Sequence, residues 1–222
     1  LGLGGQGDVY GHLVAVEVGV EGGTHQGVEL DGPALHQHRL GGLGAQAVPG
    51  GGGAAGLAGA LAAALGAMVC NLTSGKKKYA EYEADIAAAL EKLELTRKYM
   101  LRLVDEDAKA FQPLQKYLSL PKDDPERAAH MDSALRVACF IPTEVLYTAA
   151  QTAEVLRSLA DKGAKGAISD VGVGLELCRA AMRAARLNIL INAAGMEDED
   201  FAMTLRRECE RGFERYGTST AP

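Results

Sequence analysis

The feature that most constrains this chain is a run of glycines that leads directly into a long stretch without a charged residue. Pro49 is followed by Gly50–Gly53 and then by the Ala- and Leu-rich stretch 54–72. Glycine inside a helix costs about 1 kcal/mol relative to alanine, whereas alanine and leucine are strong helix formers. The pattern therefore predicts a loop that ends at a helix N-terminus, followed by a helix over residues 54–74. Backbone N–H groups and the helix dipole at such a terminus favour an anion.

A dinucleotide-binding loop is one alternative for this stretch, because Gly51, Gly53 and Gly56 spell the pattern G-x-G-x-x-G. That loop requires a preceding strand and an acidic residue about 20 positions later. Only the short segment 45–48 precedes the glycines, and Asn71 stands near the position where the acid is needed. The context therefore argues against a dinucleotide site.

A membrane span is a second alternative, because the uncharged stretch approaches the length of about 20 residues that a bilayer needs. Its composition is mostly alanine and glycine, which is more typical of a closely packed, buried helix. Gly56, Gly59 and Gly66 would let a neighbouring helix approach closely. We therefore predict a core helix and no membrane association.

The overall composition narrows the class of protein further. A net charge of −6 and a pI near 5.4 argue against nucleic acid as a partner. The four cysteines stand singly, without a C-x-x-C pair, in apolar or helical contexts. This arrangement predicts buried thiols in a cytoplasmic protein.

Residues 1–48 differ from the rest of the chain, since they hold nearly half of the 28 glycines and four of the five histidines. Almost every residue type here has codons that begin with G or C, which is typical of a GC-rich gene read in a wrong frame. His36 and His38 lack the neighbouring cysteines or carboxylates that a metal site would need. We expect a disordered, low-complexity tail that is not part of the fold, followed by one domain over residues 49–217.

Beyond the glycine run, the sequence predicts an all-α fold with about six helices packed as a bundle. Gly75 stands where a C-cap glycine ends the first helix. Ser169 is a natural N-cap for the fifth helix, and Asp170 suits its first turn. The remaining expected helices cover residues 79–118 with a kink or break at Pro113, 125–140, 142–161, 169–192 and 198–216.

Apolar periodicity singles out one carboxylate. A heptad-like count from Ile86 passes through buried-type residues and also through Arg97 and Asp107. A charge on a buried seam is costly unless it is paired or used. The ten residues between Arg97 and Asp107 span about 15 Å of helix, so the two cannot pair directly. Asp107 is therefore the site candidate that periodicity alone provides.

Several segments together form a recognisable set of motifs. They are the P-G-G-G helix entry, residues 71–79, the D-x-D-A-x-A-F pattern at 105–111, Leu-Pro-Lys-Asp at 120–123, the pair Ser169–Asp170, and N-I-L-I-N at 188–192. These segments resemble the formiminotransferase-cyclodeaminase family, which includes the stand-alone methenyltetrahydrofolate cyclohydrolases. The family normally carries a short amphipathic helix before the glycines, which residues 1–48 lack, and Gly53 replaces its usual Ser or Thr.

The resemblance implies a cyclodeaminase or a cyclohydrolase that acts on a tetrahydrofolate, with or without a polyglutamate tail, and needs no metal or redox cofactor. The resemblance implies a catalytic role for Asp170 or Asp107, and anion binding by Lys76 and the glycine loop. The residues alone favour a simpler interpretation of Lys76–Lys78, as positive charges that complement the dipole at a helix C-terminus. The implied substrate-binding residues are Gly50, Gly51, Gly52, Asn71, Lys76, Ser169, Asn188 and Asn192.

Two questions stay open at this point. Asp170 and Asn188 lie about 27 Å apart on one straight helix, so they cannot flank one reacting atom. Either the substrate is long, or a second subunit completes the site, or one of the two is structural. We expect a homodimer or a larger assembly.

A different class of function is the alternative, namely a non-enzymatic helical module that binds other proteins. That function would not explain why the polar residues Asp107 and Asn192 stand on apolar seams.

Overall fold

The computed structural model describes residues 50–217, and in that range the chain is helical and contains no strand, which confirms the all-α prediction. The expected tail, with His36 and His38, lies outside the described residues. The elements are α2 (Gly51–Thr73), η1 (Lys77–Tyr82), α3 (Glu83–Leu118), α4 (Pro125–Leu159), η2 (Lys165–Ala167), α5 (Ile168–Ala194) and α6 (Glu199–Gly217), of which η1 and η2 are 3₁₀ helices.

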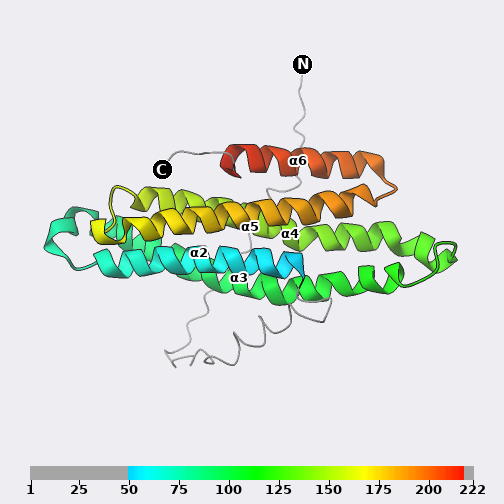
Figure 1. Ribbon diagram of the computed structural model, residues 1–222, viewed down its shortest axis with the longest axis horizontal. Coiled ribbons are helices and arrows are strands. Elements are labelled where there is room, and N and C mark those ends of the chain that lie inside the picture. The colour runs from blue at the N-terminus through cyan, green and yellow to red at the C-terminus, as the bar shows by residue number, and fades with distance from the viewer. Residues whose placement is uncertain (1–49, 218–222) are drawn as a thin grey trace, which may run out of the picture. The chain divides into compact units, whose positions relative to one another are not determined.

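Successive helices run antiparallel, and α2, α3, α4 and α5 pack around a common core while α6 lies along α5 and α4 (Figure 1). The helices differ in length, since α2 has 23 residues and α3 has 36. At 1.5 Å per residue, α3 is therefore about 20 Å longer than α2. As a result, α2 begins partway along the bundle, and α3, α4 and α5 continue beyond its N-terminus.

Helix α2 packs closely in the core because small residues replace side chains at its contacts. A Cβ atom on Gly59 would lie 2.6 Å from Cε of Met100, and one on Gly66 would lie 2.7 Å from Cδ2 of Leu156. By length and composition α2 could cross a membrane, but 61% of its most apolar window is buried inside the bundle. It therefore has the environment predicted for a core helix.

The helix starts one turn earlier than the glycine run suggested. Gly51–Gly53 form the first turn of α2, and Gly50 is the N-cap, so the expected start at Ala54 is wrong. The first turn of a helix tolerates glycine better than the interior does, and at Gly52 a side chain would clash with Asp107 of α3. At the other end Gly75 has a φ of 74°, which confirms the predicted glycine at the helix C-terminus.

The apolar seam of α3 is confirmed. Ile86, Leu93 and Met100 are buried, and Arg97 pairs with Glu94, one turn away on the same helix, at 2.6 Å. Pro113 lies inside α3 without ending it.

The predicted break near Pro142 is wrong, because α4 continues through this proline as one helix, which leaves five α-helices in residues 50–217. Proline removes one helical hydrogen bond, to the carbonyl four residues earlier. That carbonyl, on Ala138, instead accepts a hydrogen bond from Nδ2 of Asn192 on α5, at 3.2 Å. The broken bond is thus replaced from another helix.

Aspartate side chains cap the starts of two helices, while a third helix starts differently from its predicted cap. Asp124 caps α4, accepting from the N–H of Glu126 at 2.8 Å. The Oδ1 atom of Asp198 accepts from the N–H of Phe201 at 3.0 Å at the start of α6. The prediction for Ser169 is wrong, because η2 leads into α5 and Ala167 is the N-cap, without a side-chain hydrogen bond.

Candidate active site

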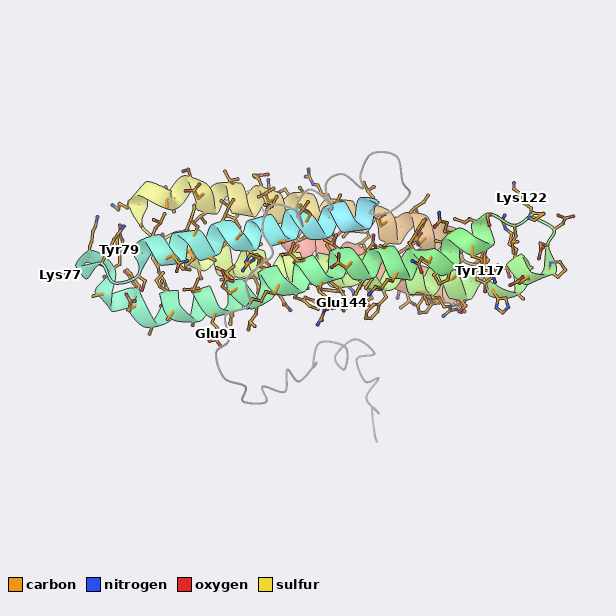
Figure 2. The ribbon with its side chains drawn as sticks, turned by 90° about the horizontal axis from the view of Figure 1, so that it is seen from below. Lys77, Tyr79, Glu91, Tyr117, Lys122 and Glu144 are labelled. Atoms are coloured by element: carbon orange, nitrogen blue, oxygen red, sulfur yellow. The ribbon has the colours of Figure 1, made fainter. Side chains whose placement is uncertain are left out.

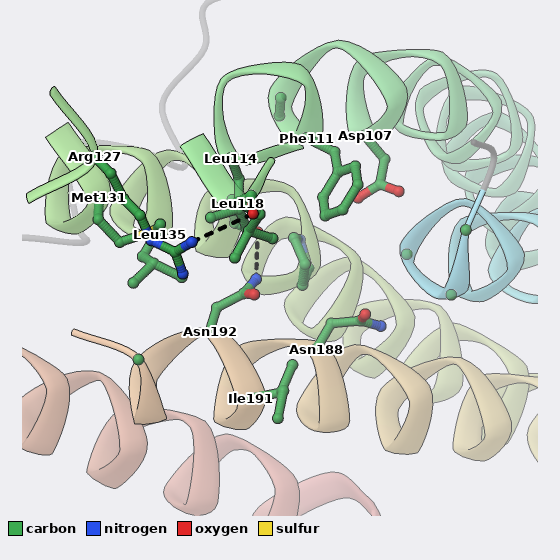
Figure 3. A pocket seen from close by; sticks show the side chains of 17 residues that line it. Asp107, Phe111, Leu114, Leu118, Arg127, Met131, Leu135, Asn188, Ile191 and Asn192 are labelled. Carbon is green, nitrogen blue, oxygen red and sulfur yellow. Dashed lines mark hydrogen bonds between the residues drawn. The ribbon is translucent and has the colours of Figure 1, made fainter. Parts of the chain in front are cut away.

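A cavity of about 560 Å³ lies beyond the N-terminus of α2, where α3, α4 and α5 continue without it. Its walls are mostly apolar, with Phe111, Leu114, Met131 and Leu135 among the lining residues. Figure 3 shows four polar side chains in this setting: Asp107 from α3, Arg127 from α4, and Asn188 and Asn192 from α5. Gly50, Gly51 and Gly52 complete the lining.

Asp107 lies directly against the first turn of α2. A Cβ atom on Gly52 would lie only 2.2 Å from Oδ1 and 2.6 Å from Cγ of Asp107, so only glycine permits this approach. Burial raises the pKa of the Asp107 carboxyl, and a hydrogen bond from the backbone of Gly53 partly offsets that effect. The site therefore holds a half-buried carboxyl group whose protonated form is favoured relative to an ordinary aspartate.

The two asparagines present acceptor oxygens. Nδ2 of Asn188 donates to the carbonyl of Ala184 at 2.9 Å, and Nδ2 of Asn192 donates to that of Ala138 at 3.2 Å. Because only the N–H end of a carboxamide can bond a carbonyl, these contacts leave each Oδ1 atom for a ligand. Asn188 also borders the glycines, since a Cβ atom on Gly51 would lie 3.4 Å from its carboxamide.

The N-terminus of α2 supplies donors at the same place. The first N–H groups of a helix have no partner within it, and they carry the positive end of the dipole. At Gly51 and Gly52 no side chain shields them. Acceptors from Asp107 and Asn188 and donors from α2 thus meet at one end of the cavity.

Arg127 is a lining residue that the sequence analysis missed. Its Nη1 atom donates to the carbonyl of Leu120 at 2.7 Å and lies 3.4 Å from that of Leu118, at the end of α3. A count backwards along α4 from Pro142 would have found it, because Ala138, Leu135, Met131 and Arg127 follow at helical spacing. Arg127 places a cation in a cavity whose other polar side chains, Asp107, Asn188 and Asn192, offer acceptor oxygens.

Four predicted site residues do not line this cavity, namely Asn71, Lys76, Ser169 and Asp170. They belong to the end of α2, the following loop and the start of α5, and the helices place them at the opposite end of the bundle. Figure 2 shows Lys77 and Tyr79 at that end and Tyr117 and Lys122 at the other. Within one chain, the cavity therefore brings together Asp107, Asn188 and Asn192 with the glycines, but not the Ser169–Asp170 pair.

The cysteines lie in the core and not in the cavity. All four are buried free thiols, as predicted, and burial raises the pKa of Cys70 to about 11. Residues 50–217 contain no group of three or more His, Cys, Asp and Glu side chains arranged to hold a metal ion. The polar side chains that line the cavity are those of Asp107, Arg127, Asn188 and Asn192, beside the backbone of Gly50–Gly52.

Comparisons with known proteins define the class. A methenyltetrahydrofolate cyclohydrolase from Methylorubrum extorquens is 40% identical over 166 residues, which are 73% of this chain and 80% of that protein. The mouse formimidoyltransferase-cyclodeaminase is 31% identical over 70% of this chain, which spans only 29% of that protein. The crystal structure of formiminotetrahydrofolate cyclodeaminase from Thermotoga maritima matches with a TM-score of 0.70 and 28% identity, covering 85% of this chain and 92% of that one.

The family model described as formiminotransferase-cyclodeaminase matches residues 43–211. With these identities and coverages, the chain belongs to the formiminotransferase-cyclodeaminase family, which confirms the resemblance drawn from its motifs.

Proposed function

We propose that this protein is an enzyme of one-carbon folate metabolism that acts on the carbon joining N5 and N10 of tetrahydrofolate. The observation that carries the proposal is the position of Asp107, a carboxyl of raised pKa held against the donor end of α2 in an apolar cavity. Its family relatives are named for two reactions at this carbon. A non-enzymatic interaction module does not explain why a half-buried carboxyl group lies at this position.

Hydrolysis of 5,10-methenyltetrahydrofolate is the reaction we favour, because the relative named for it has the higher identity and is covered over most of its length. Water adds to the methenyl carbon and gives up one proton, which forms a carbinolamine. The carbon–N5 bond then breaks as N5 is protonated and the carbinolamine hydroxyl loses its proton to solvent, which leaves the C=O group of 10-formyltetrahydrofolate and releases one proton overall. Asp107 is suited to take the proton from water and to return it to N5.

Other groups of the cavity support the same step. The N–H groups of Gly51 and Gly52 can stabilise negative charge on the oxygen of the tetrahedral carbon. The Oδ1 atoms of Asn188 and Asn192 can accept from pterin N–H groups and favour the cationic methenyl bridge. Water and proton transfer are sufficient for this reaction, so we expect no metal or redox cofactor.

Cyclodeamination is the second candidate, favoured by the Thermotoga maritima structure, which is covered over 92% of its length. Here N10 would attack the formimino carbon of 5-formiminotetrahydrofolate, and ammonia would leave to give the methenyl form. Both reactions pass through a tetrahedral carbon between the same two nitrogens, so the same residues would serve either.

We assign anion binding in this cavity to Arg127 and not to Lys76, which lies outside it. In Figure 3 Phe111 lies between Asp107 and Arg127. The exposed side chains of Leu118 and Ile191 border the same cavity. A folate with its one-carbon bridge at Asp107 would place its aminobenzoyl ring along these apolar groups and its glutamate near Arg127. A polyglutamate tail would bring further carboxylates to the same end.

We also propose a homodimer in the cytoplasm. Leu61, Met68 and Leu72 on the outer face of α2 are between 37% and 49% exposed, and α2 carries no charge. An uncharged, apolar helix face of this kind suits the same face of a second copy across a two-fold axis. The four buried free thiols are consistent with a reducing compartment.

The test follows the absorbance of the methenyl form. Purified protein is mixed either with 5,10-methenyltetrahydrofolate, whose absorbance should decay, or with 5-formiminotetrahydrofolate, from which it should appear. Asp107→Asn serves as the matched inactive variant. Absence of any enzyme-dependent change with both folates, in a protein that is folded by circular dichroism, would refute the proposed function.

A further inference from the structure

Pro142 stands in the interior of α4 at the wall of the cavity, where it leaves a carbonyl without its ordinary partner. A proline has no N–H, so it cannot donate to the carbonyl four residues earlier, on Ala138. Nδ2 of Asn192 donates to that carbonyl from α5 at 3.2 Å. Pro142, Ala138 and Asn192 all line the cavity, so this replacement takes place at the site itself.

A neighbouring contact joins α4 to α5 at this point, since Sγ of Cys139 on α4 lies 3.8 Å from the carbonyl oxygen of Ile189 on α5. Within α4, Oγ1 of Thr143 donates to the carbonyl of Cys139 at 2.8 Å. Cys139, Ile189 and Ala138 are all buried. The Asn192 side chain therefore bonds to a buried part of α4.

Asn188 offers a contrast, since it bonds to Ala184, which belongs to its own helix. The carbonyl of Ala184 already has a donor in residue 188, as in any regular helix. The carbonyl of Ala138 has no such donor, and a buried carbonyl without a partner costs about 1–3 kcal/mol. The hydrogen bond from Asn192 to Ala138 therefore satisfies a carbonyl that Pro142 leaves without a donor.

We propose that Pro142 is a positioning residue for Asn192. By removing the helical donor to Ala138, it orients the Asn192 carboxamide so that Nδ2 faces α4 and Oδ1 faces the substrate. This inference rests on the proposed function, because it gives Asn192 the task of accepting a hydrogen bond from the folate. It predicts that a residue which restores the missing N–H weakens activity while the helix itself gains stability.

The test is Pro142→Ala, with Pro113→Ala as the matched control. Both changes remove a proline from the interior of a long helix, but Pro113 is exposed and lies outside the cavity lining. Each variant should keep or raise the melting temperature, because alanine is a far better helix residue than proline. Pro142→Ala should lower kcat/KM about 10-fold, a typical loss for one well-oriented hydrogen bond of about 1.4 kcal/mol. Pro113→Ala should leave it unchanged.

A double-mutant cycle with Asn192→Ala separates positioning from simple packing. If Pro142 acts through Asn192, the double variant should have the same kcat/KM as Asn192→Ala alone. Losses that multiply, or wild-type kinetics in Pro142→Ala, would overturn the proposal.

A readout without substrate keeps this inference distinct from the proposed function. The side-chain amide protons of Asn192, identified in an NMR spectrum by their loss in Asn192→Ala, should be protected from exchange in the wild type and exposed in Pro142→Ala. If the wild type is inactive on both folates but this change is seen, the proposed function fails and the positioning of Asn192 by Pro142 stands. Equal protection in both proteins would refute the positioning itself.

Discussion

Replacing Gly52 by alanine tests whether the contact between α2 and Asp107 is the centre of the site. The new Cβ atom would lie 2.2 Å from Oδ1 and 2.6 Å from both Cγ and Oδ2 of Asp107. Since the whole carboxyl group is in the way, a small rotation cannot relieve the clash. An ordinary contact begins at 3.4 Å, so the carboxyl must move by 3.4 − 2.2 = 1.2 Å.

The expected effect on catalysis follows from that displacement. A misplacement of about 1 Å in a reacting group can cost ~10²-fold in rate, or about 2.7 kcal/mol of transition-state stabilisation. Stability should change less, because alanine gains up to about 1 kcal/mol of helix propensity over glycine while crowding costs about 1–3 kcal/mol. We therefore expect kcat/KM to fall ~10²-fold and the melting temperature to move by only a few degrees.

The assay is the absorbance change of the methenyl folate, together with thermal unfolding followed by circular dichroism. Gly172→Ala is the matched control, because it lies on the exposed side of α5 and no atom lies within 4 Å of its added Cβ. That control should unfold at the same or a higher temperature and keep wild-type kinetics. Wild-type kcat/KM in Gly52→Ala would refute the reasoning that places the chemistry at Asp107.

Three further variants and one measurement of mass have expected outcomes. Asp107→Asn should lower kcat ~10²-fold and abolish the rise of kcat/KM with pH that an ionising shuttle produces. Burial raises the pKa of Asp107 in the folded state above its value in the unfolded state. The contribution of Asp107 to the free energy of unfolding is therefore greatest below the unfolded-state pKa and is lost as the pH rises through the folded-state pKa. Asp107→Asn should for this reason have a higher melting temperature than the wild type at pH 7. Asp170→Asn should change kcat and KM by less than about threefold, since such small effects are usual for residues away from a site. A loss of activity as large as that of Asp107→Asn would mean that a second subunit brings Asp170 to the cavity, or that Asp170 is the proton shuttle. Arg127→Met should raise KM for the folate about 10-fold or more, but it should leave KM unchanged for the pteroate analogue, which lacks the glutamate. The control Lys122→Met, at an exposed position nearby, should alter neither KM. An equal effect of Arg127→Met on both ligands would show that Arg127 does not bind the glutamate. Sedimentation equilibrium should give the mass of a dimer at micromolar concentration, and a monomer there would contradict the use of the α2 face as an interface.

The parts of the site that could be predicted from the sequence are those that depend on one helix at a time. Asp107 was found because a charge interrupts an apolar repeat, and that repeat is local to α3. Arg127 interrupts the repeat of α4 in the same way, and it was missed only because the count was not extended back from Pro142. The start of α4 was predicted correctly at residue 125, because the cap residue Asp124 and the first-turn proline Pro125 are local features of the sequence.

The parts that could not be predicted depend on contacts between helices. The sequence predicted a break at Pro142 because the compensating donor, Asn192, lies 50 residues later on another helix. The resemblance implied that Ser169, Asp170, Asn188 and Asn192 all belong to the site, whereas helix geometry already placed Asp170 about 27 Å from Asn188. Of the four, only the two asparagines line the cavity. Which of them shares a site with Asp107 depends on how α3 and α5 align along the bundle, and that is a property of the packed structure.

The late start of α2 explains why the glycine run and the Asp107 carboxyl lie together. Had α2 been as long as α3, it would have filled the space between α3, α4 and α5, and its first N–H groups would have reached the end of the bundle. Because it is shorter, those N–H groups end inside the bundle, where a partner must satisfy them or a ligand must use them. Glycine leaves them unshielded and lets Asp107 approach to a distance that any side chain at Gly52 would prevent. The absence of side chains in the first turn of α2 thus lets the Asp107 carboxyl and the helix-terminal donors meet at the same point, at some cost in helix propensity.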